Sequence, residues 1–406
     1  MKILILTQWF HPEPFFKGLP FATALQARGH QVEVLTGFPN YPGGRLYPGY
    51  TVRWHQVEHL NGIRVHRVPL YPSHDAGALR RAWNYVSFAL SAASIGMAVV
   101  SRPDLIYVYH PPATVGFPAW VLSRWLGCPF VYDVQDLWPD TLRATGMVSS
   151  GTLLKMVGAW CRFVYAAAAR VVVLSPGFKQ AIAARGVPEN RIDVIMNWAE
   201  EFAALETLPE RDGPTFDVLY AGNLGKVQAL DTVLSAAAVV QAEAPQVRFV
   251  FLGDGIEKPR LELAARAAQL TNVTFLDRQT PSEAAGTMSR AGALLVHLRR
   301  DELFEITIPS KTQAYLRAGR PILMGVRGNA ADLVRRAEAG VCFEPEDPRA
   351  LADAVMAMAR LPAAERQAMG RRGHAFYQEV LSQQVAVGAF DELFRSVVRR
   401  RQSAVA

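Results

Sequence analysis

The sequence predicts an α/β protein built from two doubly wound domains, each around a mostly parallel sheet. Short runs of apolar residues, typical of buried parallel strands, alternate with segments of helical length along the chain. The pattern begins at the first residues, is interrupted by an acidic stretch at 198–214 that lacks β-forming residues, and restarts at 216. A chain of 406 residues also exceeds one ordinary hydrophobic core, which favours two domains.

The first half of the chain carries the longer series of expected strands. Residues 3–6 are expected to form a central strand, 19–29 a helix and 32–36 the next strand, which together make a βαβ unit. The other strands expected in this half are 63–68, 105–109, 130–134, 171–175 and 193–197.

The second half repeats this arrangement and then ends in helices. Its expected strands are 216–222, 247–252, 273–276, 293–297 and 321–324. The helical run at 365–400 contains no further strand. We therefore place an N-terminal domain at 1–198 and a C-terminal domain at 199–379, and expect a last helix at 380–406 to pack back on the first domain.

The composition excludes several classes of protein. Hydrophobic residues make up 50% of the chain and charged residues 19%, which is typical of a packed globular protein. Three distant cysteines, Cys128, Cys161 and Cys342, form no disulfide or metal framework and fit a reducing compartment. The net charge of +7 suits nucleic acid, an anionic membrane or phosphorylated substrates. No nucleic-acid motif is present, so the last two are preferred.

Two segments bear on membrane contact. Only four apolar residues lie between Lys2 and Thr7, too few for the apolar region of a signal peptide. The stretch 83–100 has no charged residue and is long enough to span a bilayer. It also contains Asn84 and several serines, and follows Arg80 and Arg81. We therefore expect a buried or interfacial helix with partial membrane contact rather than a spanning one.

The segment 309–319 combines a helix start, a cation and a helix stop. Pro309 suits the entry to a helix, Ser310 is able to cap it, and Gly319 followed by a proline at 321 ends it. Lys311 places a cation beside the first amides, which makes a candidate anion site. The alternative is an ordinary capped helix in an α/β domain.

Loops after the expected strands carry further candidates. The loop 37–50 contains three prolines, four glycines and four aromatic residues, so its aromatics either stack on sugars or pack the loop down. The acidic residues Asp133, Asp136 and Asp140 surround one strand end, without the spacing of a metal site. Asp136 is a candidate for sugar-hydroxyl or base roles, with helix capping as the alternative. His110 also ends a strand, where a structural role is commoner than a catalytic one.

One glycine pair in the second half resembles a nucleotide-binding motif only in part. Gly253 and Gly255 follow an expected strand, but Lys258 stands where the dinucleotide fingerprint has its third glycine. The pair is therefore weak evidence for the close approach of a ligand.

Taken together, five segments resemble the retaining GT-B glycosyltransferases of the family 4 type over nearly the whole chain. The similarity is greatest to the bacterial branch that transfers L-fucose-type or N-acetyl-amino sugars in O-antigen, capsule and colanic acid synthesis. The segments are Thr7–Glu13, Thr36–Pro42, Asp136–Pro139, Tyr220–Gly225 and Ile308–Lys311. The resemblance implies two Rossmann-like domains facing a deep crevice, a nucleotide-sugar donor on the C-terminal domain, an acceptor on the N-terminal domain, and no required metal or other cofactor.

The resemblance also implies roles for individual residues. The donor-binding residues are Lys17, Gly18, Gly222, Asn223, Lys226, Gln228, Gly253, Arg278, Pro309, Ser310 and Lys311. The acceptor-binding residues are Asn40, Tyr41, His110 and Trp138. The catalytic residues are Asp136, Glu305 and Lys311. The family's paired glutamates fall at Ile306 and Ala314, and its crevice histidine falls at Gln135, so this chain departs from the family pattern there.

The implied reaction is transfer of N-acetyl-L-fucosamine or a similar deoxy or amino sugar, with retention of configuration. The donor would be UDP-linked and the acceptor a saccharide on undecaprenyl diphosphate, at the cytoplasmic face of the inner membrane. The leaving phosphate takes the acceptor proton, so no side-chain base is required. A nucleotide-sugar epimerase of the same architecture and a non-catalytic nucleotide-sugar-binding protein remain alternatives. A phosphorylase would require a pyridoxal lysine and a far longer chain.

Overall fold

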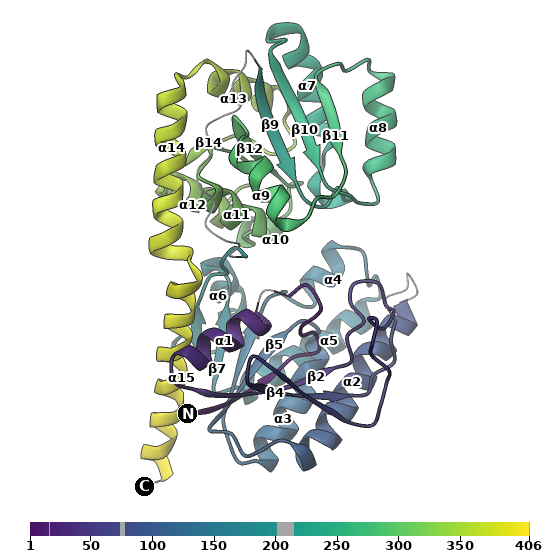
Figure 1. Cartoon of the computed structure of the whole chain (residues 1–406), viewed down its shortest axis with the longest axis vertical. Coiled ribbons are helices and arrows are strands. Elements are labelled where there is room, and N and C mark those ends of the chain that lie inside the picture. The colour runs from purple at the N-terminus through teal and green to yellow at the C-terminus, as the bar shows by residue number, and fades with distance from the viewer. Residues whose placement is uncertain (16, 74–77, 201–214, 406) are drawn as a thin grey trace. The chain divides into compact units, whose positions relative to one another are not determined.

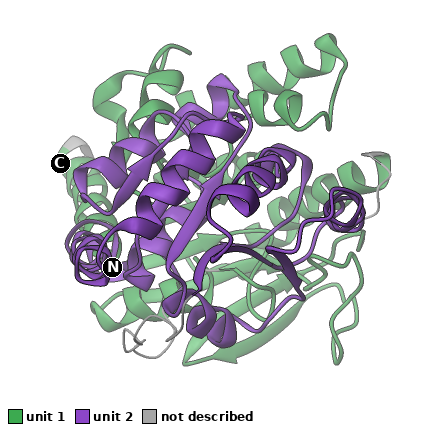
Figure 2. Cartoon of the chain, turned by 90° about the horizontal axis from the view of Figure 1, so that it is seen from above, with its two compact units in different colours: residues 1–196, 386–406 green, residues 197–385 purple. Residues whose placement is uncertain are grey.

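The computed structural model describes residues 1–15, 17–73, 78–200 and 215–405, and it divides into two compact units. Unit 1 contains residues 1–196 and 386–406, and unit 2 contains residues 197–385 (Figure 2). The sequence predicted domains at 1–198 and 199–379, so the observed boundary lies two residues earlier and unit 2 extends six residues further, to 385. Phe16 and most of the acidic stretch expected between the domains, 201–214, lie outside the described residues.

Unit 1 is organised around an eight-stranded sheet in the order β3-β4-β2-β1-β5-β6-β7-β8 (Figure 1). Its strands are β1 (Lys2–Leu6), β2 (Gln31–Gly37), β3 (Gln56–Leu60), β4 (Ile63–Val68), β5 (Leu105–His110), β6 (Phe130–Val134), β7 (Arg170–Val173) and β8 (Ile192–Val194). All neighbours are parallel except β3 and β4, and β3 was not predicted. The central strands β5 and β6 are buried along their whole length, as the apolar runs predicted.

The helices of unit 1 are α1 (Leu19–Ala27), α2 (Ala78–Val99), α3 (Gly116–Trp125), α4 (Asp140–Ala144), α5 (Gly151–Ala167), α6 (Pro176–Ala183) and most of α15 (Gln383–Val405). Helix α3 packs against both α2 and α5. Residues 386–405 of α15 join α1, where the Phe21 and Phe390 rings lie 5.2 Å apart. The predicted packing of the terminal helix on the first domain is thus confirmed.

Unit 2 contains a six-stranded, all-parallel sheet in the order β11-β10-β9-β12-β13-β14. Its strands are β9 (Phe216–Ala221), β10 (Val247–Leu252), β11 (Val273–Leu276), β12 (Ala293–His297), β13 (Ile322–Gly325) and β14 (Gly340–Cys342). Only the short β14 was not predicted. The doubly wound α/β fold class predicted for both halves is confirmed.

Helices cover the sheet of unit 2 and supply its core. They are α7 (Asp231–Glu243), α8 (Lys258–Ala267), α9 (Pro281–Ser289), α10 (Glu302–Ile306), α11 (Ser310–Ala318), α12 (Asn329–Arg336), α13 (Pro348–Arg360) and α14 (Ala363–Phe376). Helices α7 and α13 pack together, and Val233, Val240 and Val355 are fully buried beneath them. A five-residue π-helical turn, Tyr377–Leu381, follows α14. Strand ends and helix starts therefore meet along the carboxyl edge of this sheet, where open α/β sheets bind ligands.

Candidate active site

Helix α11 begins at the carboxyl edge of the unit 2 sheet, as predicted. Pro309 is its N-cap, with φ −59° and ψ 137°, and Gly319 ends it in a left-handed conformation with φ 66°. Ser310 is the first helical residue, and no side chain caps the helix, so the proposed capping by Ser310 is wrong. The first amides of α11 consequently have no side-chain acceptor and form a suitable end for an anion.

Lys311 is the second residue of α11, and its ammonium group lies at the end of β9. Its Nζ is 4.7 Å from the centroid of the Tyr220 ring, a cation–π distance. Burial lowers the pKa of Lys311 from 10.5 to about 8. Among the described residues, no carboxylate lies within ion-pair distance of this ammonium. A half-buried cation that has no carboxylate counterion among these residues favours the binding of an anionic ligand.

Two glycines allow close backbone packing beside Lys311. A Cβ at Gly222, whose φ is 132°, would lie 2.9 Å from Nζ of Lys311. A Cβ at Gly253, with φ 140°, would lie 2.2 Å from the Gly222 carbonyl oxygen. Both positions therefore require glycine, and the loops after β9 and β10 pack backbone to backbone. The Tyr315 hydroxyl accepts the Ala221 N–H at 2.8 Å, which fixes α11 against the end of β9.

The predicted donor-binding residues in the loop after β9 differ in exposure. Asn223 and Lys226 are exposed and remain candidates. The Gln228 side chain is buried and accepts the Gly225 N–H at 3.0 Å, so it shapes the loop rather than presenting itself to a ligand. The His297 ring connects this loop to the loop after β14, because its Nδ1 lies 2.8 Å from the Gln228 carbonyl oxygen and its Nε2 accepts the Glu346 N–H at 3.1 Å.

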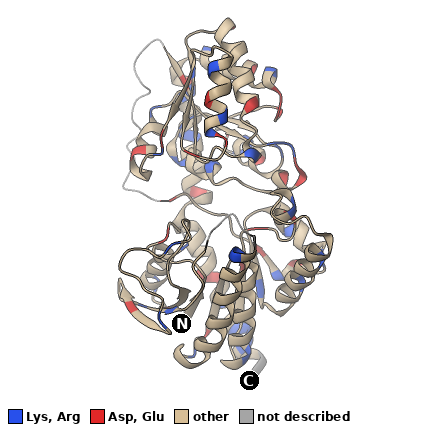
Figure 3. Ribbon diagram, turned by 90° about the vertical axis from the view of Figure 1, so that its right-hand side faces the viewer, with Lys and Arg blue, Asp and Glu red and all other residues tan. Residues whose placement is uncertain are grey.

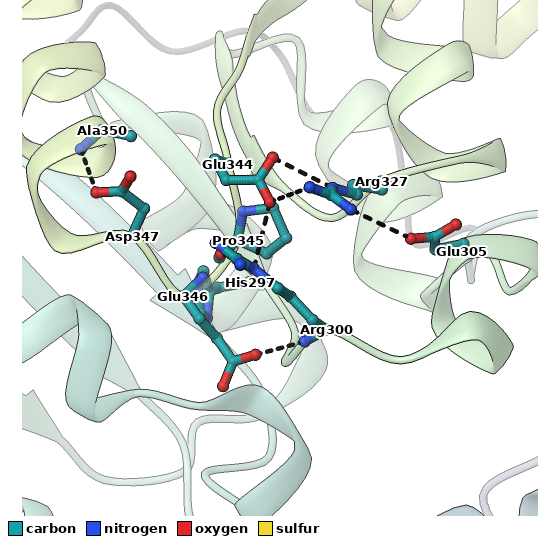
Figure 4. A network of polar contacts seen from close by, with 9 residues as sticks. All are labelled: His297, Arg300, Glu305, Arg327, Glu344, Pro345, Glu346, Asp347 and Ala350. Atoms are coloured by element: carbon teal, nitrogen blue, oxygen red, sulfur yellow. Dashed lines mark hydrogen bonds and ion pairs between the residues drawn. The ribbon is translucent and has the colours of Figure 1, made fainter.

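Glu305 belongs to a network of ion pairs that sequence reasoning missed (Figure 4). Its Oε1 lies 3.8 Å from Nη1 of Arg327, and Arg327 also pairs with Glu344. Arg300 lies 3.2 Å from the same Glu344 carboxylate and donates to the Pro345 carbonyl at 2.9 Å. The network joins the loops after β12, β13 and β14 to α10. The network therefore holds the half-buried Glu305 at the carboxyl edge of the sheet. Its members are too far apart in the sequence for a local motif to reveal these ion pairs.

Arg278 lies elsewhere in unit 2. It lines a groove of about 700 Å³ together with Leu219, Arg248, Gln279 and Arg290. The lining of this groove contains none of the other predicted donor-binding residues. The structure therefore does not bring Arg278 together with Lys311 and the glycine loops.

Lys17 contradicts its expected role in donor binding. Its side chain is completely buried, and Nζ lies 2.7 Å from Oδ2 of Asp133. The same carboxylate accepts the Tyr107 hydroxyl at 2.6 Å and the Gln135 amide. Gly18 is buried as well, and its N–H bonds to the Phe15 carbonyl at 3.2 Å. We therefore assign Lys17 and Gly18 to the internal structure of unit 1, with Asp133 as the counterion.

The predicted acceptor loop is held by a buried glutamate that was not among the candidates. Oε1 of Glu13 accepts the N–H groups of Asn40 and Tyr41 at 2.9 and 2.8 Å, and Oε2 accepts that of Phe10 at 2.9 Å. Burial raises the pKa of Glu13 from 4.5 to about 7, although these hydrogen bonds oppose the shift. Nothing in the sequence around Glu13 indicates that its carboxylate would bind the backbone N–H groups of a loop some 27 residues further along the chain.

Asn40 and Tyr41 differ in what they present. The Asn40 side chain is buried, donates to the Phe38 carbonyl and accepts from Asn84, so its polar groups serve the loop itself. The Tyr41 ring stacks on Trp9, with 4.6 Å between centroids. Of these two loop residues, Tyr41 is the one whose side chain is partly exposed and presents an aromatic surface.

The end of β5 and the loop after β6 place the other acceptor candidates together. The His110 ring is buried 5.6 Å from the Trp138 ring, and burial lowers its pKa to about 3, so it is neutral. Burial raises the pKa of the half-buried Asp136 to about 6. Asp136 is thus the predicted carboxyl with the perturbation expected of a functional acid or base. Asp140 instead pairs with Arg185.

No group of three or more His, Cys, Asp or Glu side chains in the described part of the chain is arranged to hold a metal ion. One helix in that part, Leu79–Val99, is long and apolar enough to cross a membrane. Its inner side packs into unit 1, where Phe88 and Ala92 are fully buried. Helices in the cores of soluble proteins can have the same length and apolar composition.

Comparison with known proteins agrees with this architecture. Residues 19–198 match the family described as the glycosyl transferase 4-like domain, and residues 215–360 match the family described as glycosyl transferases group 1. The chain is 26% identical to the putative colanic acid biosynthesis glycosyl transferase WcaI of Escherichia coli, over 89% of the chain and 93% of that relative. It is also 26% identical to a GDP-mannose-dependent alpha-mannosyltransferase of Mycobacterium tuberculosis, over 89% and 90%.

Solved structures show the same fold at low identity. Sucrose-phosphate synthase from Thermosynechococcus elongatus superposes with a TM-score of 0.71 at 17% identity, covering 98% of this chain and 100% of that one. Anabaena HepE in complex with UDP and glucose gives a TM-score of 0.66 at 16% identity, with the same coverage. The fold and the family matches define an enzyme, a glycosyltransferase with the GT-B fold. The 4-like match lies almost entirely in unit 1, and the group 1 match lies in unit 2.

Proposed function

We propose that this glycosyltransferase takes its sugar from a UDP-linked donor whose diphosphate binds at the start of α11. The observation that carries the proposal is the half-buried Lys311 ammonium, which lies against Gly222 and belongs to the first turn of a helix that no side chain caps. Backbone amides and an ammonium together form a site for phosphate oxygens. The UDP complex of HepE supports the choice of base, whereas the mycobacterial relative is named for GDP-mannose.

The proposed reaction retains the configuration of the sugar. The acceptor hydroxyl attacks from the face that the diphosphate leaves, and a leaving phosphate oxygen takes its proton. Negative charge grows on the departing diphosphate, so groups that stabilise this charge lower the barrier. Lys311 and the α11 amides supply such stabilisation without a metal ion. Asp136, with its pKa near 6, accepts hydrogen bonds from sugar hydroxyls, and Glu305 contacts the transferred sugar.

Release of nucleoside diphosphate tests this proposal directly. Loss of one donor to a developing charge typically costs about 3 kcal/mol, so Lys311→Ala should lower turnover roughly 10²-fold. The same variant should lose the thermal stabilisation by UDP that wild type shows. Lys179→Ala, on α6 of unit 1, is the matched control and should behave as wild type. A folded Lys311→Ala protein with normal turnover would contradict the proposal.

The sugar and the acceptor are part of the same proposal. We infer transfer of N-acetyl-L-fucosamine or a related deoxy or amino sugar to a saccharide on undecaprenyl diphosphate, during synthesis of a cell-surface polysaccharide. The sequence resemblance supports this class, as does the E. coli relative named for colanic acid biosynthesis. A lipid-linked acceptor requires the enzyme to work at the cytoplasmic membrane surface.

An exposed apolar face on unit 1 supports work at a membrane. Helix α3 packs against both α2 and α5, and large apolar side chains of all three helices are exposed. These side chains are Leu79, Trp83, Val86, Leu90, Trp120, Trp125, Leu153, Met156 and Phe163. Leu79 is 88% exposed and Trp125 66%. A patch of this kind marks an interaction surface rather than an ordinary solvent face.

The charges on these three helices favour an anionic bilayer as the partner. None of the helices contains an aspartate or a glutamate. Their cations are Arg80, Arg81, Arg124, Lys155 and Arg162. Apolar side chains with aromatic anchors and surrounding cations suit the interface of a membrane rich in anionic lipid.

Flotation with vesicles tests the membrane part separately. Wild type should float with vesicles that contain phosphatidylglycerol at low salt, and Trp125→Ala/Met156→Ala should float less. Val194→Ala, which removes an exposed apolar side chain on β8, is the control. Equal flotation of all three proteins, or none with wild type, would refute membrane contact through this face while leaving donor binding unaffected.

A further inference from the structure

A basic pocket lies at the amino edge of the unit 1 sheet, opposite the edge that carries the acceptor candidates. Lys2 begins β1, Asp104 precedes β5 and Gly127 precedes β6, so the pocket lies at the amino ends of neighbouring parallel strands. Arg401 of α15 completes it, and the cavity has a volume of about 700 Å³. None of the residues in its lining belongs to the proposed donor or acceptor site.

Two guanidinium groups converge in this pocket. A Cβ on Gly127 would lie 3.6 Å from Nη2 of Arg102 and 3.8 Å from Nη2 of Arg401. Both groups therefore surround one point on the backbone, where a glycine with φ 57° leaves the space open. Both also act on the adjacent Cys128 thiol, because they oppose the rise in its pKa that burial causes.

The cations in the pocket lack a matching carboxylate. Asp104 is the one acidic side chain in its lining, and Oδ2 of Asp104 accepts the backbone N–H of Lys2 at 2.8 Å. Within the part of the chain that the structure describes, no carboxylate lies within ion-pair distance of Arg102 or Arg401. Bringing like charges together without a counterion is unfavourable, and a bound anion would relieve the repulsion. Figure 3 marks in blue the lysines and arginines, including those near the C-terminus.

The geometry points to a phosphate group as the ligand, and we propose that this pocket is a second anion site, distinct from the donor site. Guanidinium groups bind phosphate oxygens in a bidentate manner, and two of them grip one phosphate from two sides. The cavity also has room for the group that the phosphate carries. That chemistry is shared by a soluble phosphate monoester and by the headgroup of an anionic phospholipid. The exposed Trp125, two residues from Gly127, continues the apolar face toward the pocket.

The test uses the full chain with a charge-matched control. Arg102→Gln/Arg401→Gln removes the two converging cations, and Arg53→Gln/Arg64→Gln removes two exposed arginines elsewhere in unit 1. One arm titrates sn-glycerol 3-phosphate by calorimetry at low salt. The other arm measures flotation with vesicles of phosphatidylcholine alone and with added phosphatidylglycerol. A UDP titration of every variant shows whether the donor site is intact.

We expect the pocket variant to lose roughly tenfold in affinity in one of the two arms, because hydrogen bonds to charged groups are the strong ones. The control should change less than about twofold, and UDP binding should be the same in both. A loss in the calorimetric arm identifies a soluble phosphate ester, and a loss confined to anionic vesicles identifies a lipid headgroup. Pocket and control variants that behave alike in both arms would overturn the proposal, whatever happens at the donor site.

Discussion

Replacing Lys17 with methionine tests the reassignment of this lysine from donor binding to structure. The methionine fills a similar volume but leaves the Asp133 carboxylate, which is 0% exposed, without its counterion. Removing one partner of a buried ion pair typically costs about 3–5 kcal/mol. The Tyr107 hydroxyl and the Gln135 amide still donate to the carboxylate, so we expect the lower end, about 3 kcal/mol.

The second half of the experiment removes the orphaned charge. Lys17→Met/Asp133→Asn carries no buried charge at this site. Tyr107 and Gln135 donate to different carboxylate oxygens, so the introduced amide oxygen accepts from one of them and the amide NH2 donates to the oxygen of the other. The double variant should therefore recover more than half of the lost stability, and the double-mutant cycle should show a coupling above about 1 kcal/mol.

Tryptophan fluorescence in urea is the assay, because the chain has eight tryptophans and only Trp198 lies in unit 2. The signal therefore reports the unfolding of unit 1. Lys17→Met that unfolds at the wild-type urea concentration but no longer binds UDP would refute our reasoning and restore the donor-binding role of Lys17.

Three further predictions concern the candidate active site. Because the pKa of Lys311 is about 8, UDP affinity should fall as pH rises through 8, and calorimetry from about pH 7 to 9.5 should show this in wild type but not in Lys311→Arg. The folded-state pKa of Glu13 is raised from 4.5 to about 7, so the folded protein holds the proton more tightly and stability falls as pH rises through this window. The loss is about 2–3 kcal/mol, and Glu13→Gln should flatten it in urea titrations at about pH 5 and 7.5. Gly253→Ala should lower the Tm and abolish stabilisation by UDP, since its Cβ would meet a carbonyl oxygen at 2.2 Å, whereas Gly286→Ala, with nothing within 4 Å, should do neither.

Local patterns in the sequence predicted most of the fold. Buried parallel strands read as continuous apolar runs, so β5, β6 and β12 were recognisable without any knowledge of their neighbours. The limits of α11 were also predictable, because a proline and a glycine act on the backbone at their own positions. Short strands without such a run, β3 and β14, were missed, since only their pairing partners define them.

The candidate site was predictable only where its chemistry is local. Lys311 stands next to the helix start that makes it useful, so the sequence alone indicated an anion site there. Arg327 reaches Glu305 from the loop after β13 and also pairs with Glu344 from the loop after β14, and no spacing along the chain predicts these contacts.

Periodicity and backbone preferences act over a few residues, so the two-unit α/β architecture and the helix that begins at Pro309 could be predicted from the sequence alone. The pairing of charges depends instead on how distant segments of the chain come together. Lys17 pairs with Asp133 across 116 residues of sequence, whereas Arg102 and Arg401 both lie near Gly127 and neither forms an ion pair with a carboxylate of the described residues. Strand order and crossover handedness set these distances. The same residue type is therefore a structural cation at Lys17 and a cation without a carboxylate partner among the described residues at Lys311, a difference that composition does not carry.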